Sequence, residues 1–419
     1  MVTAPAPDAT PTSLVTPGYL VLLAAAVAFF VAGGVVLPVA SRYARDVLGA
    51  DELGVGLAIG SFSIAALALR PLVGWSADRF GRRPLLLVGS LVNVASLVLH
   101  LLASSLPVFV AARALLGAAE AFFLVAFIAA VADLAPPSRR GESLSYGSLT
   151  LYLGVAFGPW IGETLLQLSS YAWVWLAGAV IGVVAIVLSV LAPETKPADA
   201  RPDAQTDARP VVRTGRRPPR LIHPAGIEPG VISFLGLVGM AAFFTFLPLY
   251  GDEAGMDGVA LPFLAYAVVV IALRIVGATW PDRFGAVRVS GAALGIGGAG
   301  LAIFALVPTT AGIVIGTLVF ATGVAFLVPA LLSVAVARVP VDERGRVVGT
   351  ASVFWDLSLG AGPVVLGVAA SAGGYGAAFA VAALASVVGL ALLLVRRHSL
   401  VAPAEPPPVP SAGLVADRG

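Results

Sequence analysis

The chain has 419 residues, of which 59% are hydrophobic and only 11% are charged. Soluble domains are nearer half apolar and one quarter charged. A soluble protein of this composition could not cover its surface with polar groups, so we expect the lipid bilayer to be its solvent. The formal net charge of +2 does not indicate a nucleic-acid partner. Without cysteine there is no disulfide or thiolate ligand, and the three scattered histidines predict no metal site.

Twelve apolar runs are long enough to cross the hydrocarbon layer, which takes about 17–25 residues each. They predict an all-α integral membrane protein. Residues 1–17 form a tail without the Lys or Arg that a cleaved secretory signal needs before its apolar core, so we expect a retained first helix. The expected transmembrane helices are 18–40, 53–75, 84–104, 107–134, 144–167, 171–192, 229–250, 259–280, 287–307, 310–337, 347–370 and 375–395.

One long polar segment, residues 193–228, divides these helices into two groups of six. It is rich in Pro, Ala, Asp and Arg and has no apolar periodicity, which is typical of a flexible linker. We therefore expect one six-helix bundle at 18–192, a second at 229–395 and a C-terminal tail at 396–419.

The basic residues are distributed unequally between the two sides of the membrane. With the N-terminus placed inside, 20 of the 25 Lys and Arg residues fall in cytoplasmic loops and tails, two fall outside, and three lie within spans: Arg70, Arg113 and Arg274. Because positive residues favour the cytoplasmic side, both termini and the linker are expected there, in a multi-pass protein of the plasma (inner) membrane. Arg70 and Arg274 lie near the cytoplasmic ends of their spans, and we expect them to extend toward lipid phosphate.

The two halves share an internal repeat. The segment Asp-Arg-Phe-Gly at 78–81 returns at 282–285, which is 204 residues later, and the same offset relates Arg70 to Arg274. Six spans separate the copies, so the halves have the same orientation, and we expect two pseudo-symmetric bundles around a central cavity.

The charged segment between the second and third spans, Gly74-x3-Asp78-Arg79-x-Gly81-Arg82-Arg83, resembles the loop signature of the major facilitator superfamily. Arg113-x3-Gly117-x3-Ala121 is similar to the family's fourth-span arginine motif, and Gly154-x3-Gly158-Pro159-x2-Gly162 is similar to the fifth-span motif of its proton-coupled exporters. Pro193-Glu194-Thr195 resembles an ending common after the sixth span. The resemblance covers all twelve spans and implies the fold and the transport activity of twelve-span drug/proton antiporters.

The first of these motifs has electrostatics of its own. Asp78 is expected at the C-terminal end of a helix, whose partial negative charge disfavours an acid unless cations or the N-terminus of another helix face it. The neighbouring arginines supply cations, and the resemblance implies a latch between the halves that holds the outward-facing state. Solvated arginines that only set the topology are the alternative. The expected members are Gly74, Asp78, Arg79, Gly81, Arg82, Arg83 and Asp133, the last placed to pair with Arg82.

Four charged side chains are candidates for proton coupling. Arg113 and Glu120 lie two helical turns apart on one face of the fourth span, which predicts either a coupling pair in which Glu120 binds the proton or a structural pair. Asp356 has no cation within a turn, and an isolated buried acid favours its protonated form, as a proton carrier requires. The alternative is a neutral acid that only forms hydrogen bonds to serine or the backbone. Glu163 is a weaker candidate because it lies nearer the outer face, and simple hydration there is the alternative.

The fifth span carries Gly154, Gly158, Pro159 and Gly162, which remove side chains and one backbone donor. This composition permits a kink and close packing on a neighbouring helix. The resemblance implies that such packing seals the interior of exporters against leak, and by symmetry the pair Gly362-Pro363 is expected to do the same in the eleventh span.

Aromatic side chains gather in the spans expected to face the cavity. Few hydrogen-bonding groups accompany them, and Asn93 is the sole asparagine, so the cavity favours a lipophilic guest over a sugar. Lipid-facing positions are an equally good interpretation for each aromatic residue. The cavity candidates are Phe29, Phe30, Phe243, Phe244, Phe246 and Trp355.

These observations predict a secondary-active transporter and not an enzyme, since the sequence holds no Gly-x4-Gly-Lys phosphate-binding run and no catalytic motif. We predict proton-coupled efflux of lipophilic drug-like compounds or secondary metabolites by alternating access, driven by the proton gradient without a cofactor, in a chain that acts as a monomer. The alternatives are transport of a sugar or an organic acid, and a non-transporting receptor or scaffold, which would have no use for a repeated latch.

Overall fold

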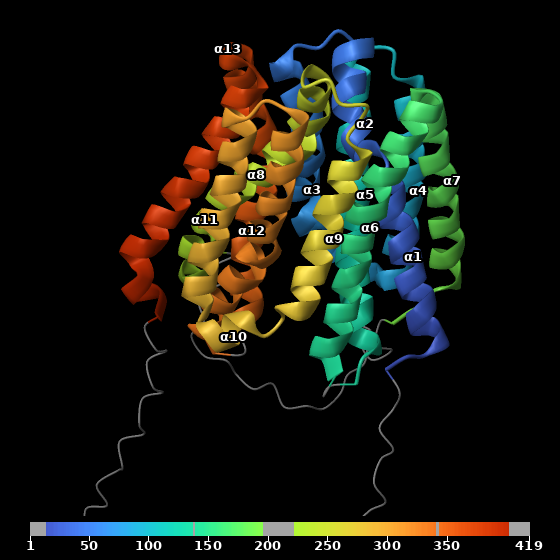
Figure 1. The fold of residues 1–419 in the computed structure, drawn as a ribbon. Helices are drawn as coiled ribbons and strands as arrows, with labels where there is room; N and C mark the ends of the chain where they lie inside the picture. Colours follow the sequence, from blue (N-terminus) through green and yellow to red (C-terminus); the bar gives the residue numbers. More distant parts are fainter. Residues whose placement is uncertain (1–13, 137–138, 196–221, 341–342, 402–419) are drawn as a thin grey trace, which may run out of the picture.

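The computed structural model describes residues 14–136, 139–195, 222–340 and 343–401. All regular structure in this part of the chain is helical, and the long helices run side by side (Figure 1). The first half contains α1 (Pro17–Gly34), α2 (Val36–Arg42), the π-helical segment η1 (Tyr43–Val47), α3 (Glu52–Phe80), α4 (Arg82–Leu102), α5 (Leu106–Leu134), α6 (Arg140–Leu168) and α7 (Tyr171–Leu191).

The second half has the same kind of organisation, with one helix broken and two joined. Its last helix has non-helical backbone at Gly373 and Gly374 and therefore contains two consecutive spans. The elements are α8 (Pro224–Glu253), α9 (Ala260–Val276), α10 (Trp280–Phe284), α11 (Ala286–Leu306), α12 (Thr310–Ala337) and α13 (Arg344–Val401).

The described helices account for the twelve expected spans. Ten helical segments are long and apolar enough to cross a membrane, and one of them, Arg344–Leu400, contains the last two spans. The remaining span is the shorter apolar helix Ala260–Val276. The predicted all-helical membrane fold is therefore confirmed.

Several helix boundaries differ from the expected ranges. The first span continues through η1 to Val47, and α9 stops at Val276, where a turn leads into the short α10. The helix α8 begins at Pro224, inside the range expected to be linker, because a proline suits the first helical turn and the side chain of His223 accepts a hydrogen bond from the backbone of Ala225. Residues 196–221 of the expected linker, and 1–13 and 402–419 of the expected tails, lie outside the described part.

The same helix pairs are in contact in both halves. The helix α3 packs on α5 as α9 packs on α12, and α4 packs on α5 as α11 packs on α12. Similarly, α4 contacts α7 as α11 contacts the second part of α13. Contacts between the halves run mainly along α3 with α13 and α6 with α9.

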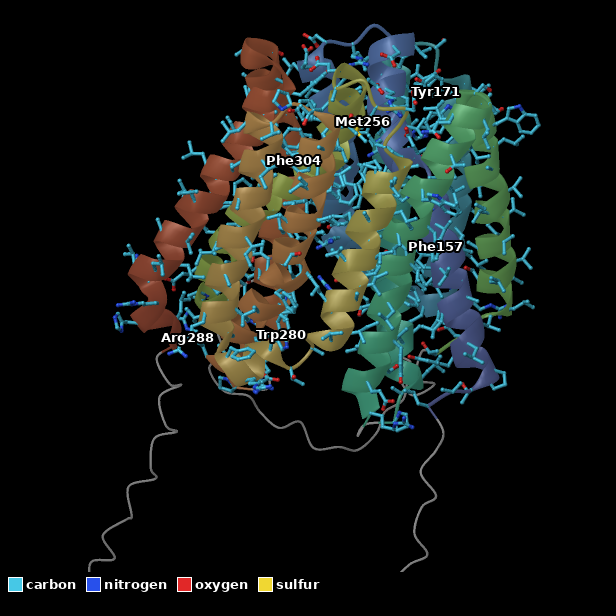
Figure 2. The ribbon with its side chains drawn as sticks, in the orientation of Figure 1. Phe157, Tyr171, Met256, Trp280, Arg288 and Phe304 are labelled. Atoms are coloured by element: carbon cyan, nitrogen blue, oxygen red, sulfur yellow. The ribbon has the colours of Figure 1, made fainter. Side chains whose placement is uncertain are left out.

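The two ends of the bundle differ in composition. Trp280 and Arg288 lie at the lower end in Figure 2, whereas Tyr171 and Met256 lie at the upper end. We call the lower end the arginine-rich face, because its loops also carry Arg82, Arg83, Arg139 and Arg283, and the upper end the opposite face.

Candidate functional site

A largely apolar cavity of about 390 Å³ lies between the two halves. Helices from both halves contribute to its walls, notably α1, α3, α5 and α6 from the first and α8, α9, α12 and α13 from the second. The volume is within the range of about 300–1,000 Å³ that is usual for small-molecule sites. The expected aromatic residues that line it are Phe29, Phe30, Phe244 and Trp355.

Phe243 and Phe246 do not line this cavity, so their assignment to it was wrong. Both are completely buried in the second half. The ring of Phe243 packs against Phe263 and Tyr266, and that of Phe246 stacks on Tyr375. On α8 they point away from the side on which Phe244 faces the cavity. How α8 is rotated about its own axis decides this, and composition alone does not reveal it.

Three charged side chains line the cavity: Arg113, Glu120 and Arg274. Arg113 is only 1% exposed, and its Nε and Nη1 have no hydrogen-bond partner within the described part of the chain. Its guanidinium lies 5.2 Å from the centre of the Phe62 ring. Glu120 interacts electrostatically with Asp356, Arg70 and Arg113, but among the described residues no hydrogen bond joins it to Arg113.

Asp356 is not isolated, contrary to the expectation from its own span. Its carboxylate forms an ion pair with Arg70, at 2.5 Å from Nη1 and 2.9 Å from Nη2. Arg70 comes from α3 and Asp356 from α13, so the pair joins the two halves. The expected extension of Arg70 toward lipid was therefore also wrong: a buried carboxylate is a stronger partner for its charge.

Arg274 likewise faces the interior and not lipid phosphate. Its guanidinium donates to the hydroxyl of Tyr152 on α6 and lies 4.0 Å from the centre of that ring. Arg274 lies 204 residues after Arg70, and Tyr152 lies 204 residues before Asp356. The two pairs therefore occupy corresponding positions in the repeat. The repeat that relates Arg70 to Arg274 was visible in the sequence and could have revealed Tyr152 as a site residue.

Glu163 lies outside the cavity, in a network that joins the halves at the opposite face. It is completely buried, pairs with Arg42 and accepts a hydrogen bond from the backbone of Val259 at 3.1 Å. Arg42 also holds Asp252 of α8, at 2.7 and 2.9 Å, and Arg45 reaches the same carboxylate at 3.4 Å. Glu163 is therefore a buried partner of Arg42 in this structure and not a hydrated group, and its role in proton coupling stays a prediction.

At the arginine-rich face, the expected pair of Arg82 and Asp133 is present at 3.1 Å. Glu194 of the Pro-Glu-Thr segment accepts hydrogen bonds from the backbone N–H groups of Arg82 and Arg83 at 3.0 and 3.2 Å, so it caps the N-terminus of α4. Gly81, with φ of 98°, makes the turn that brings the carboxylate there. The side chain of Asp78 lies outside the described residues, and its latch role stays a prediction.

The remaining members of that motif lie at the end of α3. Gly74 is in the helix, with open space where a Cβ would project. Arg79 places its guanidinium 5.5 Å from the ring centre of Trp75 and 5.7 Å from that of Phe80. Both rings are more than half exposed, so this arginine lies at the surface of the bundle.

The fifth-span glycines lie directly against α1. A Cβ at Gly154, Gly158 or Gly162 would collide with Phe30, Gly34 or Val35, respectively. Pro159 is inside the same helix. Gly362 has the equivalent position in the second half, where its nearest neighbour is Ala241 of α8. Close packing of the two helices is thus a property of the fold, and the sealing role assigned to it is a separate hypothesis.

No group of three or more His, Asp or Glu side chains in the described ranges could hold a metal ion. The arrangement instead combines an apolar cavity between two repeated bundles with charged groups at its walls. Such a site can bind an amphipathic small molecule and exchange protons with a carboxylate.

Comparison with known proteins agrees with this architecture. A family model described as Major Facilitator Superfamily matches residues 21–363 and 259–415. An uncharacterised MFS-type transporter of Salmonella typhimurium is 28% identical over 377 residues, which cover 87% of this chain and 93% of that protein. A crystal structure of a POT family transporter has a TM-score of 0.76 at 13% identity, and one of the nucleoside transporter NupG has 0.73 at 14%. They cover 92% and 90% of this chain, and 97% and 99% of their own. The chain belongs to the Major Facilitator Superfamily, and it is a multi-pass membrane transporter and not an enzyme.

Proposed function

We propose that this chain couples proton movement to the export of lipophilic small molecules by alternating access. The observation that carries the proposal is the position of Glu120, the one carboxylate among the described residues that line the largely apolar cavity between the halves. Ionisable groups inside a membrane are costly and commonly mark proton or substrate pathways. The close packing of α6 on α1 supports export, through the resemblance of its glycine motif to those of proton-coupled exporters.

The orientation belongs to the same proposal. The excess of arginine at one face supports a cytoplasmic position for that face and for both termini in the plasma membrane. The cavity then becomes accessible from either side in turn, with the Arg42–Asp252 pair as one of the contacts that would have to open at the outer side.

Proton flux in proteoliposomes tests the proposal. Liposomes with purified protein and an internal pH dye receive a panel of lipophilic cations, lipophilic carboxylates, neutral drugs and sugars. We expect a pH change with at least one lipophilic compound, in the direction of exchange, and none with sugars. Glu120→Gln removes the titratable group and should abolish the change while substrate binding persists. Failure of every compound to move protons would sink the coupling claim.

A matched control separates loss of the proton site from loss of the fold. Glu253→Gln removes a carboxylate that does not line the cavity and should leave the flux unchanged. If protons moved in the same direction as the guest, exchange would be contradicted. Only the claim that proton movement is coupled to transport would then remain.

A further inference from the structure

The repeat brings an arginine to the boundary between the halves twice, but the two arginines meet different partners. Arg70 faces the carboxylate of Asp356, whereas Arg274 faces the hydroxyl of Tyr152. A tyrosine hydroxyl is neutral near pH 7, so it hydrogen-bonds to a guanidinium without neutralising its charge. The charge of Arg274 is therefore left without a carboxylate partner in the described part of the chain.

Arg113 adds a second cation in need of acceptors. It is fully enclosed, yet two of its nitrogens lack hydrogen-bond partners among the described residues. A buried guanidinium with unmade hydrogen bonds is unfavourable, and carboxylate is the acceptor that matches its fork geometry. Both Arg113 and Arg274 line the same cavity, one from each half.

The charges of the lining residues do not balance. Two arginines and one glutamate face the cavity, which leaves one positive charge when Glu120 is ionised. The adjacent pair of Arg70 and Asp356 contributes no net charge. A guest with a single negative charge would bring the sum to zero, and a cationic guest would increase the imbalance.

The remaining walls define the body of the guest. They are aromatic and aliphatic, with Phe29, Phe30, Phe244, Met240 and Trp355 among them. Such walls favour a planar, apolar skeleton, and the cavity volume limits it to a small molecule.

We propose that the guest is an amphipathic organic monoanion, an aromatic skeleton with one carboxylate, and that Arg274 is its anchor with Arg113 as the second donor. This inference rests on the proposed function only in taking the cavity as the transport site. It differs from that proposal in naming the charge of the guest and the residue that recognises it.

Equilibrium binding to the purified full-length chain in a neutral detergent tests the inference. The three probes are 2-naphthoate, its neutral analogue 2-naphthamide and the cation 2-naphthylmethylammonium. We expect 2-naphthoate to bind about tenfold tighter than the amide or more, the ratio that one hydrogen bond to a charged group provides. The cation should bind weakest.

Variants assign the preference to Arg274. Arg274→Gln should reduce the affinity for 2-naphthoate about tenfold and leave the amide unaffected, whereas Arg274→Lys should retain part of the preference. Arg283→Gln is the matched control, since this exposed arginine of α10 lies over the ring of Phe284 and outside the cavity. Thermal unfolding of each variant checks that it is folded. If Arg274→Gln does not fold, the reduced preference of Arg274→Lys provides the test.

Equal affinity for the three probes, absence of binding by all three, or an unchanged preference in Arg274→Gln would each overturn the inference. The binding assay does not measure proton movement, so it fails independently of the proposed function. If the chain binds the anion but moves no protons, the anion site stands and the proposed coupling is wrong. If it moves protons but shows no preference for the anion, the coupling stands and the anion site is wrong.

Discussion

At the scale of single residues, the pair of Arg70 and Asp356 is the clearest consequence of bringing distant segments together. The two side chains are 29% and 13% exposed, so each charge is largely withdrawn from water and depends on the other. Asp356 was a candidate proton carrier because no cation is near it in sequence. In the structure its carboxylate is taken up by the ion pair with Arg70 and is not among the residues that line the cavity, whereas Glu120 is, so Glu120 is the candidate that the proposed function uses.

The pair can be tested by a double-mutant cycle. Asp356→Asn leaves the Arg70 charge without its partner and should lower the free energy of unfolding by about 1–3 kcal/mol or more. Arg70→Gln combined with Asp356→Asn should recover part of that loss, because neither partner is then a lone charge. Thermal unfolding of the purified variants measures both. Additive losses in the double variant would show that the two side chains do not stabilise the fold as a pair.

At the scale of helices, the contact of α6 with α1 is set by three glycines at spacings of four residues. They form one face of α6, where the backbone of α1 approaches so closely that no side chain fits. Gly33 of α1 has open space where a Cβ would project and lines the cavity. The two glycine positions therefore allow the same substitution to be compared in a crowded and an open place.

Gly158→Ala should destabilise the bundle by about 1–3 kcal/mol, the usual cost of overpacking. Gly33→Ala is the control, and it should be neutral or slightly stabilising, since alanine favours a helix by roughly 0.5–1 kcal/mol over glycine. Thermal unfolding and passive proton leak in proteoliposomes are the measurements. A stable Gly158→Ala variant would contradict the close contact, and a destabilised variant without leak would contradict only the sealing role.

The turn between α3 and α4 is the second helix-scale feature. Glu194 and Asp133 hold its arginines, and the repeat places a weaker copy between α10 and α11, where Ala286 and Val287 replace the two arginines. Asp78→Asn should therefore reduce transport strongly while expression stays near normal, and Asp282→Asn in the second copy should have a smaller effect. Transport assays and membrane expression levels decide this. Normal transport by Asp78→Asn would remove the latch.

At the scale of the whole molecule, the network of Arg42, Glu163 and Asp252 joins the halves at the opposite face. Among the described residues, Asp252 is the one carboxylate that α8 places in this network. It binds two arginines of the first half, Arg42 and Arg45. Loss of its charge removes part of the free energy that favours this arrangement, so the population of the alternative arrangement should increase.

Asp252→Asn should increase the accessibility of the cavity from the opposite face several-fold. The chain has no cysteine, so a single Ala267→Cys substitution in the cavity wall provides a specific label site for a membrane-impermeant maleimide. The labelling rate from that side is compared with and without Asp252→Asn, and Glu253→Gln is the matched control. Equal rates in all three backgrounds would show that the Asp252 carboxylate does not hold the halves together.

The sequence by itself determined the solvent, the number of spans, the division into halves and the repeat. Hydropathy and loop charge are local properties of the chain, so they predict which segments cross a membrane without knowledge of their neighbours. The motif around Arg82 identified its contact with Asp133 correctly, and the glycines around Gly158 predicted close packing on a neighbouring helix without indicating that it would be α1.

Only the tertiary structure decided which polar and charged side chains meet across the two halves. Arg70 with Asp356, Arg274 with Tyr152, and Arg42 with Asp252 each join residues of different halves, and the rotation of α8 separates Phe244 in the cavity from its neighbour Phe243 in the core. These contacts depend on how whole helices turn and dock, which follows from packing over many side chains and not from any short segment.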